Sequence, residues 1–117
     1  MNRKMLQVLC LCVAGLSAVA RADEKPPFDL SDPKRIDAGR QRFSGSCTGY
    51  CHGNEGRGGR APAFIGRDDL DVDYIFHTVT NGRRSGGMIM PRWGETYSPE
   101  EVWELVAYVH FLNQQKN

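Results

Sequence analysis

Cys47, Cys51 and His52 stand within one six-residue stretch, Cys-Thr-Gly-Tyr-Cys-His. A cysteine thiol can add to a vinyl group of haem, and a histidine beside it can ligate the iron from one side. The pattern therefore predicts one haem c, bound covalently through Cys47 and Cys51, with His52 as an iron ligand. The usual spacing for this chemistry is C-x-x-C-H, whereas three residues separate the two cysteines here.

The extra residue displaces Cys47, because the step from Cys51 to His52 is the usual one. On a helix, positions i+3 and i+4 both lie on roughly the face of residue i, and a glycine such as Gly49 tolerates a local bulge. Two interpretations stay open. Either both cysteines are bonded through a bulged turn, which we favour, or Cys51 alone is bonded and Thr48 occupies the place of the first cysteine.

A site without haem is the remote alternative for the same residues. Two cysteines and a histidine can form half of a zinc site or a redox disulfide. After residue 22 the chain has no further cysteine, and His77 and His110 fall within helical patterns. A redox-disulfide domain needs a βαβ pattern, which is absent.

The first 22 residues have the pattern of a secretory signal peptide. A basic start at 1–4 precedes an apolar run at 5–20, and two overlapping A-x-A patterns end at Ala22. The apolar run is too short for a comfortable membrane span. We expect cleavage after Ala22, an N-terminal tail at 23–30 and one small domain at 31–117, with an uncleaved anchor as the alternative.

Cleavage of the predicted signal peptide would change the net charge of the chain, and export would set the compartment in which it works. Removal of residues 1–22 takes away three basic residues and no acidic ones, so the formal net charge falls from +1 to −2. Such a chain is not basic enough to indicate nucleic-acid binding. Because haem is attached to exported proteins of this kind outside the cytoplasm, we expect the protein in the periplasm.

Three helical segments must position the cysteines and the histidine. Asp32-Pro33 starts the first, which should end near 44–46; the second should run from about Asp71 to Asn81. Ser98-Pro99-Glu100-Glu101 starts the third with a capping box. Its expected buried stripe consists of Val102, Leu105, Val106, Val109 and Leu112. We predict an all-α fold, with a glycine-rich run at 53–60 and a loop without period at 83–97.

In this order the elements resemble the class I cytochrome c family over nearly all of the mature chain. The shared features are Gly39 and Phe43 in the first helix, the Cys/Cys/His site, the glycine-rich run leading to Pro62, Asn81-Gly82 after the second helix, Met90-Pro91-Arg92-Trp93, and Tyr108 in the last helix. The resemblance implies three main helices wrapped around the haem. It also implies that the first and last helices cross, with Gly39 against Tyr108 and Phe43 beside them.

The resemblance further implies an axial methionine from the loop before the last helix. The family's methionine is followed by proline and then by an aromatic two residues further on, which fits Met90 better than Met88. The Pro62 carbonyl would accept a hydrogen bond from His52 and fix its ring. Trp93 would line the pocket near the haem propionates.

An iron held by imidazole on one side and thioether on the other has no open position for a substrate. The resemblance therefore implies an electron-transfer protein, not an enzyme. Its redox partners would be a dehydrogenase or membrane complex on one side and an oxidase or reductase on the other. We expect the protein to be a monomer, without a membrane span once the signal peptide is removed. The alternatives are a haem subunit of a larger oxidoreductase and a haem enzyme or sensor with an open iron position.

Overall fold

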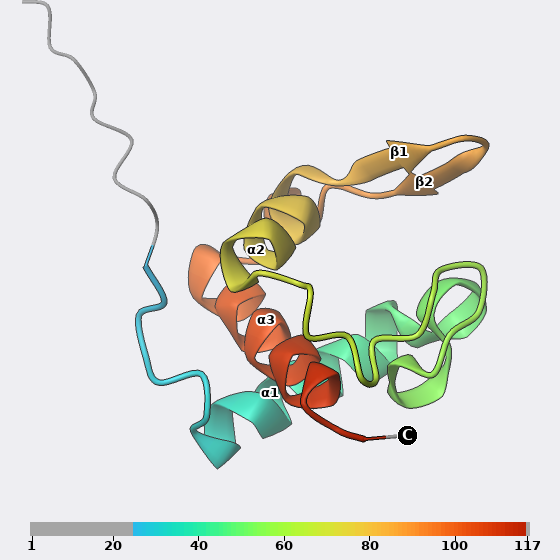
Figure 1. Cartoon of the computed structure of the whole chain (residues 1–117). Helices are drawn as coiled ribbons and strands as arrows, with labels where there is room; N and C mark the ends of the chain where they lie inside the picture. The colour runs from blue at the N-terminus through green and yellow to red at the C-terminus, as the bar shows by residue number, and fades with distance from the viewer. Residues whose placement is uncertain (1–24, 117) are drawn as a thin grey trace, which may run out of the picture.

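The computed structural model describes residues 25–116, so the predicted signal peptide lies outside the described residues. Three helices make up most of the fold: α1 (Pro33–Ser46), α2 (Val72–Asn81) and α3 (Pro99–Asn113) (Figure 1). A π-helical turn at Thr48–His52 follows α1 directly. Short 3-10 turns lie at Asn54–Gly56 and Trp93–Glu95. None of the helices described within 25–116 is long and apolar enough to cross a membrane.

The predicted helix starts are confirmed by their capping hydrogen bonds. The Asp32 side chain accepts one backbone N–H in the first turn of α1, and the Asp71 side chain accepts two in the first turn of α2. At α3, the Ser98 hydroxyl accepts from the Glu101 N–H at 3.2 Å, and the Glu101 carboxylate accepts from the Ser98 N–H at 2.9 Å. These bonds satisfy N–H groups that the helix itself leaves unpaired.

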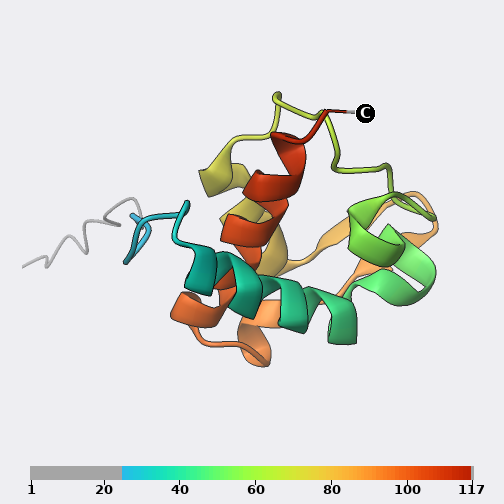
Figure 2. The same cartoon turned by 90° about the horizontal axis from the view of Figure 1, so that it is seen from below.

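The predicted crossing of the first and last helices is confirmed: α1 and α3 cross in Figure 2, and Gly39 lies where they meet. A Cβ atom on Gly39 would lie 1.9 Å from the backbone oxygen of Glu104 and 3.0 Å from Cβ of Tyr108. The rings of Phe43 and Tyr108 meet edge to face with centroids 5.3 Å apart. Only a residue without a side chain lets the two backbones approach this closely.

Helix α3 forms the centre of the hydrophobic core. Its predicted stripe is buried, and the structure adds Trp103, Glu104, Ala107 and Tyr108 to the buried positions. Helix α2 packs on it, with the ring of Phe76 stacked on Trp103 at 4.4 Å between centroids. Because α1 and α2 both pack on α3, residues on more than one face of α3 are buried.

The segment predicted as a loop without period is more ordered than expected. Strands β1 (Arg83–Ser85) and β2 (Met88–Met90) pair antiparallel, joined by a tight turn in which Gly86 has a φ of 57°. Glycine suits the positive φ that two-residue hairpin turns require. Three-residue strands are too short to show a period-two pattern, so the prediction of a loop was wrong here. The fold remains mostly helical.

The end of the expected N-terminal tail packs against the core. Phe28 and Leu30 both contact the hydrophobic cluster. The guanidinium of Arg35 lies 4.4 Å from the centroid of the Phe28 ring, a distance at which a cation is attracted to the ring face. The described part of the tail is therefore attached to the start of α1.

We expect Gly39→Ala to destabilise the protein by about 3 kcal/mol, because the new Cβ has to push α1 away from the backbone of α3. Gly45→Ala in the same helix is the control: a Cβ there meets nothing within 4 Å. Alanine also favours helix over glycine by up to about 1 kcal/mol. Denaturant unfolding followed by circular dichroism measures both. Equal stability of the two variants would contradict the close crossing.

Candidate haem site

The turn that carries the cysteines and the histidine is wider than an α-helical turn. The His52 N–H donates to the Cys47 carbonyl at 3.2 Å, and the Gly53 N–H donates to the Thr48 carbonyl at 2.8 Å. These are i→i+5 bonds, so each turn holds one residue more than in an α-helix, and the helical conformation is interrupted at Gly49. Cys47 thereby lies one hydrogen-bonded turn before His52 despite the extra residue.

The glycine-rich run folds back onto this turn. The Gly58 N–H donates to the His52 carbonyl at 2.8 Å, and the Ala61 N–H donates to the Cys51 carbonyl at 2.9 Å. A third bond, from the Phe64 N–H to the Gly56 carbonyl at 2.9 Å, closes the loop. The backbone carbonyls of Cys51 and His52 are therefore satisfied by the loop, which holds the turn in place.

The imidazole of His52 lies against two aromatic rings. It stacks on Phe64 with centroids 4.9 Å apart and lies 6.0 Å from Phe43. Burial lowers the pKa of His52, which favours the neutral ring that can ligate a metal. Its Nδ1 atom is buried without a hydrogen-bond partner, and Pro62 is exposed. The implied bond from His52 to the Pro62 carbonyl is therefore not formed in this structure.

The two cysteines are free thiols in different surroundings. Cys47 is half-buried and packs against the hydrophobic core. Burial, and to a smaller extent the neighbouring Cys51, raises the pKa of the Cys47 thiol to about 11. Cys51 is exposed. One turn thus holds one thiol beside the core and one thiol at the surface.

The hairpin places the two candidate methionines on one face. Met90 pairs with Arg83 and Met88 with Ser85, and these cross-strand pairs point to the same side because side chains alternate along a strand. Met90 is half-buried and packs against the core, whereas Met88 is 38% exposed. Figures 1 and 2 both show the hairpin on the same side of the helices as the segment 47–65.

A residue that the sequence analysis missed links the two parts of the site. The hydroxyls of Tyr97 and Ser46 share a hydrogen bond of 2.6 Å, and Ser46 immediately precedes Cys47. The ring of Tyr97 stacks on Trp93, with centroids 5.7 Å apart. The bond joins residues 51 positions apart, so no local pattern could have predicted it. Trp93 itself is half-buried against the core.

The described residues fit a covalently bound haem at this end of the fold. Two free thiols and one imidazole share a turn, and the buried Nδ1 of His52 is still without a partner. The hairpin brings a half-buried thioether, Met90, to the same side. Thiols that can form thioether bonds, a nitrogen ligand and a sulfur ligand are the donor set of a c-type haem.

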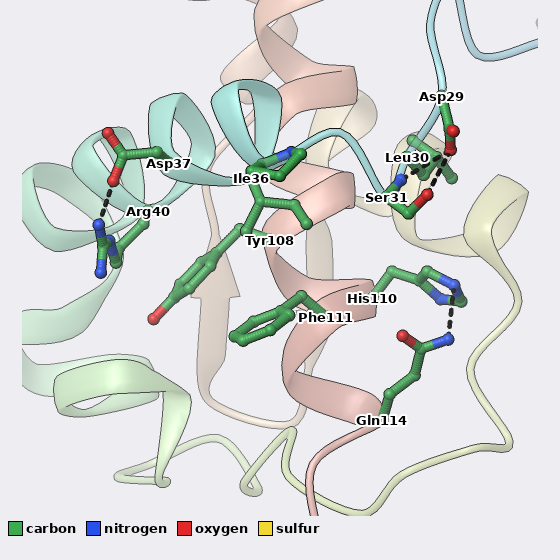
Figure 3. Close-up of a pocket in the computed structure, with 11 residues that line it drawn as sticks. Asp29, Leu30, Ser31, Ile36, Asp37, Arg40, Tyr108, His110, Phe111 and Gln114 are labelled. Atoms are coloured by element: carbon green, nitrogen blue, oxygen red, sulfur yellow. Dashed lines mark hydrogen bonds and ion pairs between the residues drawn. The ribbon is translucent and has the colours of Figure 1, made fainter.

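A separate crevice lies between the N-terminal segment, α1 and α3, and contains none of the predicted site residues (Figure 3). Its apolar part is formed by Ile36, Tyr108 and Phe111. An ion pair between Asp37 and Arg40 lies at one side. The candidate haem site is thus distinct from this hollow.

The comparisons with known proteins point to one family. The family model described as cytochrome c oxidase, cbb3-type, subunit III, matches residues 34–109. Among curated proteins, the chain is similar to the cbb3-type cytochrome c oxidase subunit FixP of Azorhizobium caulinodans, with 35% identity over 90 residues. This match covers 69% of the chain but only 28% of FixP, so the chain spans less than a third of that relative.

Two solved structures have a similar fold. Cytochrome CL of Methylophaga aminisulfidivorans matches with a TM-score of 0.58 and 28% identity, over 70% of this chain and 55% of that one. The c-type cytochrome XoxG of Methylobacterium extorquens matches with a TM-score of 0.56 and 23% identity, over 68% of this chain and 50% of that one. At that identity the second match shows the fold alone.

We expect Ser46→Ala and Tyr97→Phe each to destabilise the protein by about 1 kcal/mol, because either change removes the hydroxyl–hydroxyl bond. The double variant should be no less stable than either single variant, since the same bond is lost once. Denaturant unfolding measures this cycle. Tyr74→Phe is the control, because its hydroxyl accepts from Arg83 on the exposed surface. Additive losses in the double variant would exclude the coupling.

Proposed function

We propose that this chain, which belongs to the family of cytochrome c oxidase, cbb3-type, subunit III, is a monohaem electron-transfer protein with one covalently bound haem c. Its fold and its family agree with the resemblance to class I cytochromes c. In this proposal it passes single electrons between a dehydrogenase or membrane complex and an oxidase or reductase.

The observation that carries the proposal is the arrangement of ligand-bearing segments at one end of the fold. The turn with Cys47, Cys51 and His52 and the hairpin with Met90 lie on the same side of the helices. When bound, a haem supplies a one-electron couple between Fe(II) and Fe(III). Every other task, namely attachment, ligation and exclusion of water, belongs to the residues of this chain.

The roles of the site residues follow from their positions. Cys47 and Cys51 would attach the haem, and the i→i+5 bond from His52 to Cys47 supports attachment through both. His52 would ligate the iron in its neutral form, held by stacking on Phe64. The half-buried thioether of Met90 would be the second ligand, and a soft thioether favours Fe(II) and raises the reduction potential.

Two further residues would bind the cofactor from the sides. Trp93, half-buried and stacked on Tyr97, would line the pocket. Pro62 would offer its carbonyl to the unpaired Nδ1 of His52, a bond that fixes ring orientation in ligating histidines. That bond is absent in the present structure, where Nδ1 has no partner.

The periplasm is the compartment we propose, with the signal peptide cleaved after Ala22. The mature chain would work as a monomer and dock through a small, transient interface, as weak redox encounters do. A second candidate function is a haem subunit of a larger oxidoreductase. The similarity to FixP favours it, because FixP is a subunit of a cbb3-type cytochrome c oxidase.

We expect Met90→Ala to lower the reduction potential of the haem-loaded protein by on the order of 100 mV, because a soft axial ligand is lost. The weak far-red absorption of an iron–thioether bond should disappear, and the reduced form should bind carbon monoxide. Met88→Ala is the matched control and should change none of these. Loss of the thioether band in Met88→Ala, with Met90→Ala unaffected, would reverse the assignment.

The number of thioether bonds can be read from the α-band of the reduced pyridine adduct. We expect the band of a haem with no free vinyl group in the wild type, and a band shifted to the red in Cys47→Ser, because one vinyl group is then unreacted. Thr48→Ala should leave the band unchanged. A wild-type band already at the red-shifted position, and unmoved in Cys47→Ser, would show attachment through Cys51 alone.

A further inference from the structure

The hairpin formed by β1 and β2 exposes an apolar side chain in the middle of a strand. Among the large hydrophobic residues exposed in the described part of the chain, Ile89 has the highest exposed fraction, 60%. Arg84 is its cross-strand partner. Because side chains alternate along a strand, Arg84 and Ile89 share one face, here called the outer hairpin face, and Met90 lies on the other.

The outer hairpin face lies close to the candidate haem site without being part of it. The inner face carries Met90, which packs against the core, while the hairpin projects from the helices on the side of the segment 47–65 (Figures 1 and 2). A two-residue turn and three-residue strands do not bury an isoleucine by themselves. An isoleucine in this position is therefore available for contact with another molecule.

Positive charge is concentrated at the end of the fold that carries the candidate haem site and the hairpin. The segments 53–62 and 82–92 together contain five arginines and one glutamate, whereas the remainder of 25–116 contains seven basic and eleven acidic residues. Arg83 donates to the Tyr74 hydroxyl at 2.9 Å. The side chains of Arg84 and Arg92 are exposed and make no hydrogen bond or ion pair to another described residue. A protein of nearly balanced charge thus has one positive end.

Resting on the proposed function, we propose that the outer hairpin face, with Arg92 at the base of the hairpin, is the surface on which an acidic redox-partner protein docks. The arginines attract the negative partner and orient the encounter, and Ile89 provides an apolar contact that excludes water at its centre. The contact would bring the partner next to the Met90 side of the haem.

The charge distribution favours an acidic protein over the other occupants. A second copy would bring two positive hairpins together, and like charges facing each other oppose association. An anionic membrane would also attract arginines, but a single exposed isoleucine buries too little apolar surface for stable insertion. The membrane is kept as an outcome of the test.

The test measures reduction of the oxidised haem-loaded protein by soluble cytochrome b5, an acidic donor, in a stopped-flow instrument. One electron moves from reduced cytochrome b5 to the protein, with no change in bonds or protons. At low ionic strength, Arg84→Gln should slow the bimolecular reaction roughly threefold, and high salt should remove the difference. Ile89→Ser should slow it about fivefold at either ionic strength.

Matched variants and a second donor complete the design. Ile89→Val should restore most of the wild-type rate, and Lys34→Gln, which removes an exposed positive charge at the start of α1, should leave the rate unchanged. Reduction by hexaammineruthenium(II), a small cation, should not be slowed by Arg84→Gln. The reduction potential and the absorption spectrum should be the same in all four variants.

Rates with cytochrome b5 that are equal in wild type, Arg84→Gln and Ile89→Ser would overturn the docking proposal while leaving the electron-transfer function intact. Binding to vesicles of phosphatidylglycerol and phosphatidylcholine, lost in Ile89→Ser, would overturn it in favour of a membrane surface. Purified protein without a reversible one-electron couple would instead refute the proposed function.

Discussion

The close crossing of α1 and α3 at Gly39 is the constraint on which the candidate site depends. Cys47 alone separates α1 from the π-helical turn at Thr48–His52, so the angle and depth of the crossing set where that turn lies. Phe43, one turn beyond Gly39, contacts Tyr108 on one side and His52 on the other. The aromatic contacts of Phe43 therefore link the position of α3 directly to His52, the proposed iron ligand.

A buried carboxylate holds the same two helices in register. The side chain of Glu104 is 9% exposed, and its two oxygens accept from Arg35 at 3.1 Å and from Arg42 at 2.5 Å. Both arginines belong to α1, and each also reaches an exposed acid of α3. A carboxylate removed from water needs such partners, so a shift of α1 along α3 would leave a buried charge unpaired.

The other half of the site reaches its place through contacts of the loops. Gly82 has a φ of 73°, and a Cβ there would lie 2.5 Å from the Met90 carbonyl oxygen, so the base of the hairpin is closed around it. Tyr97 then connects the segment after the hairpin to Ser46 beside the cysteines. The segment after the hairpin and the cysteine-bearing turn are thus both held at the C-terminal end of α1. Such an arrangement suits the proposed electron-transfer site, which has to change charge with little movement.

The sequence by itself determined the helices and indicated the chemistry of the candidate site, because both depend on residues close together in the chain. Asp32, Asp71 and Ser98 start helices through bonds within a few residues, and the cysteines and the histidine share one turn. The hairpin register, the stacking of His52 on Phe64 and the bond from Tyr97 to Ser46 were decided only by the tertiary structure. The bond from Tyr97 to Ser46 joins residues 51 positions apart. The three-residue strands of the hairpin and the ring stack beside the glycine-rich run are not helical, so they leave no period in the sequence by which they could be predicted.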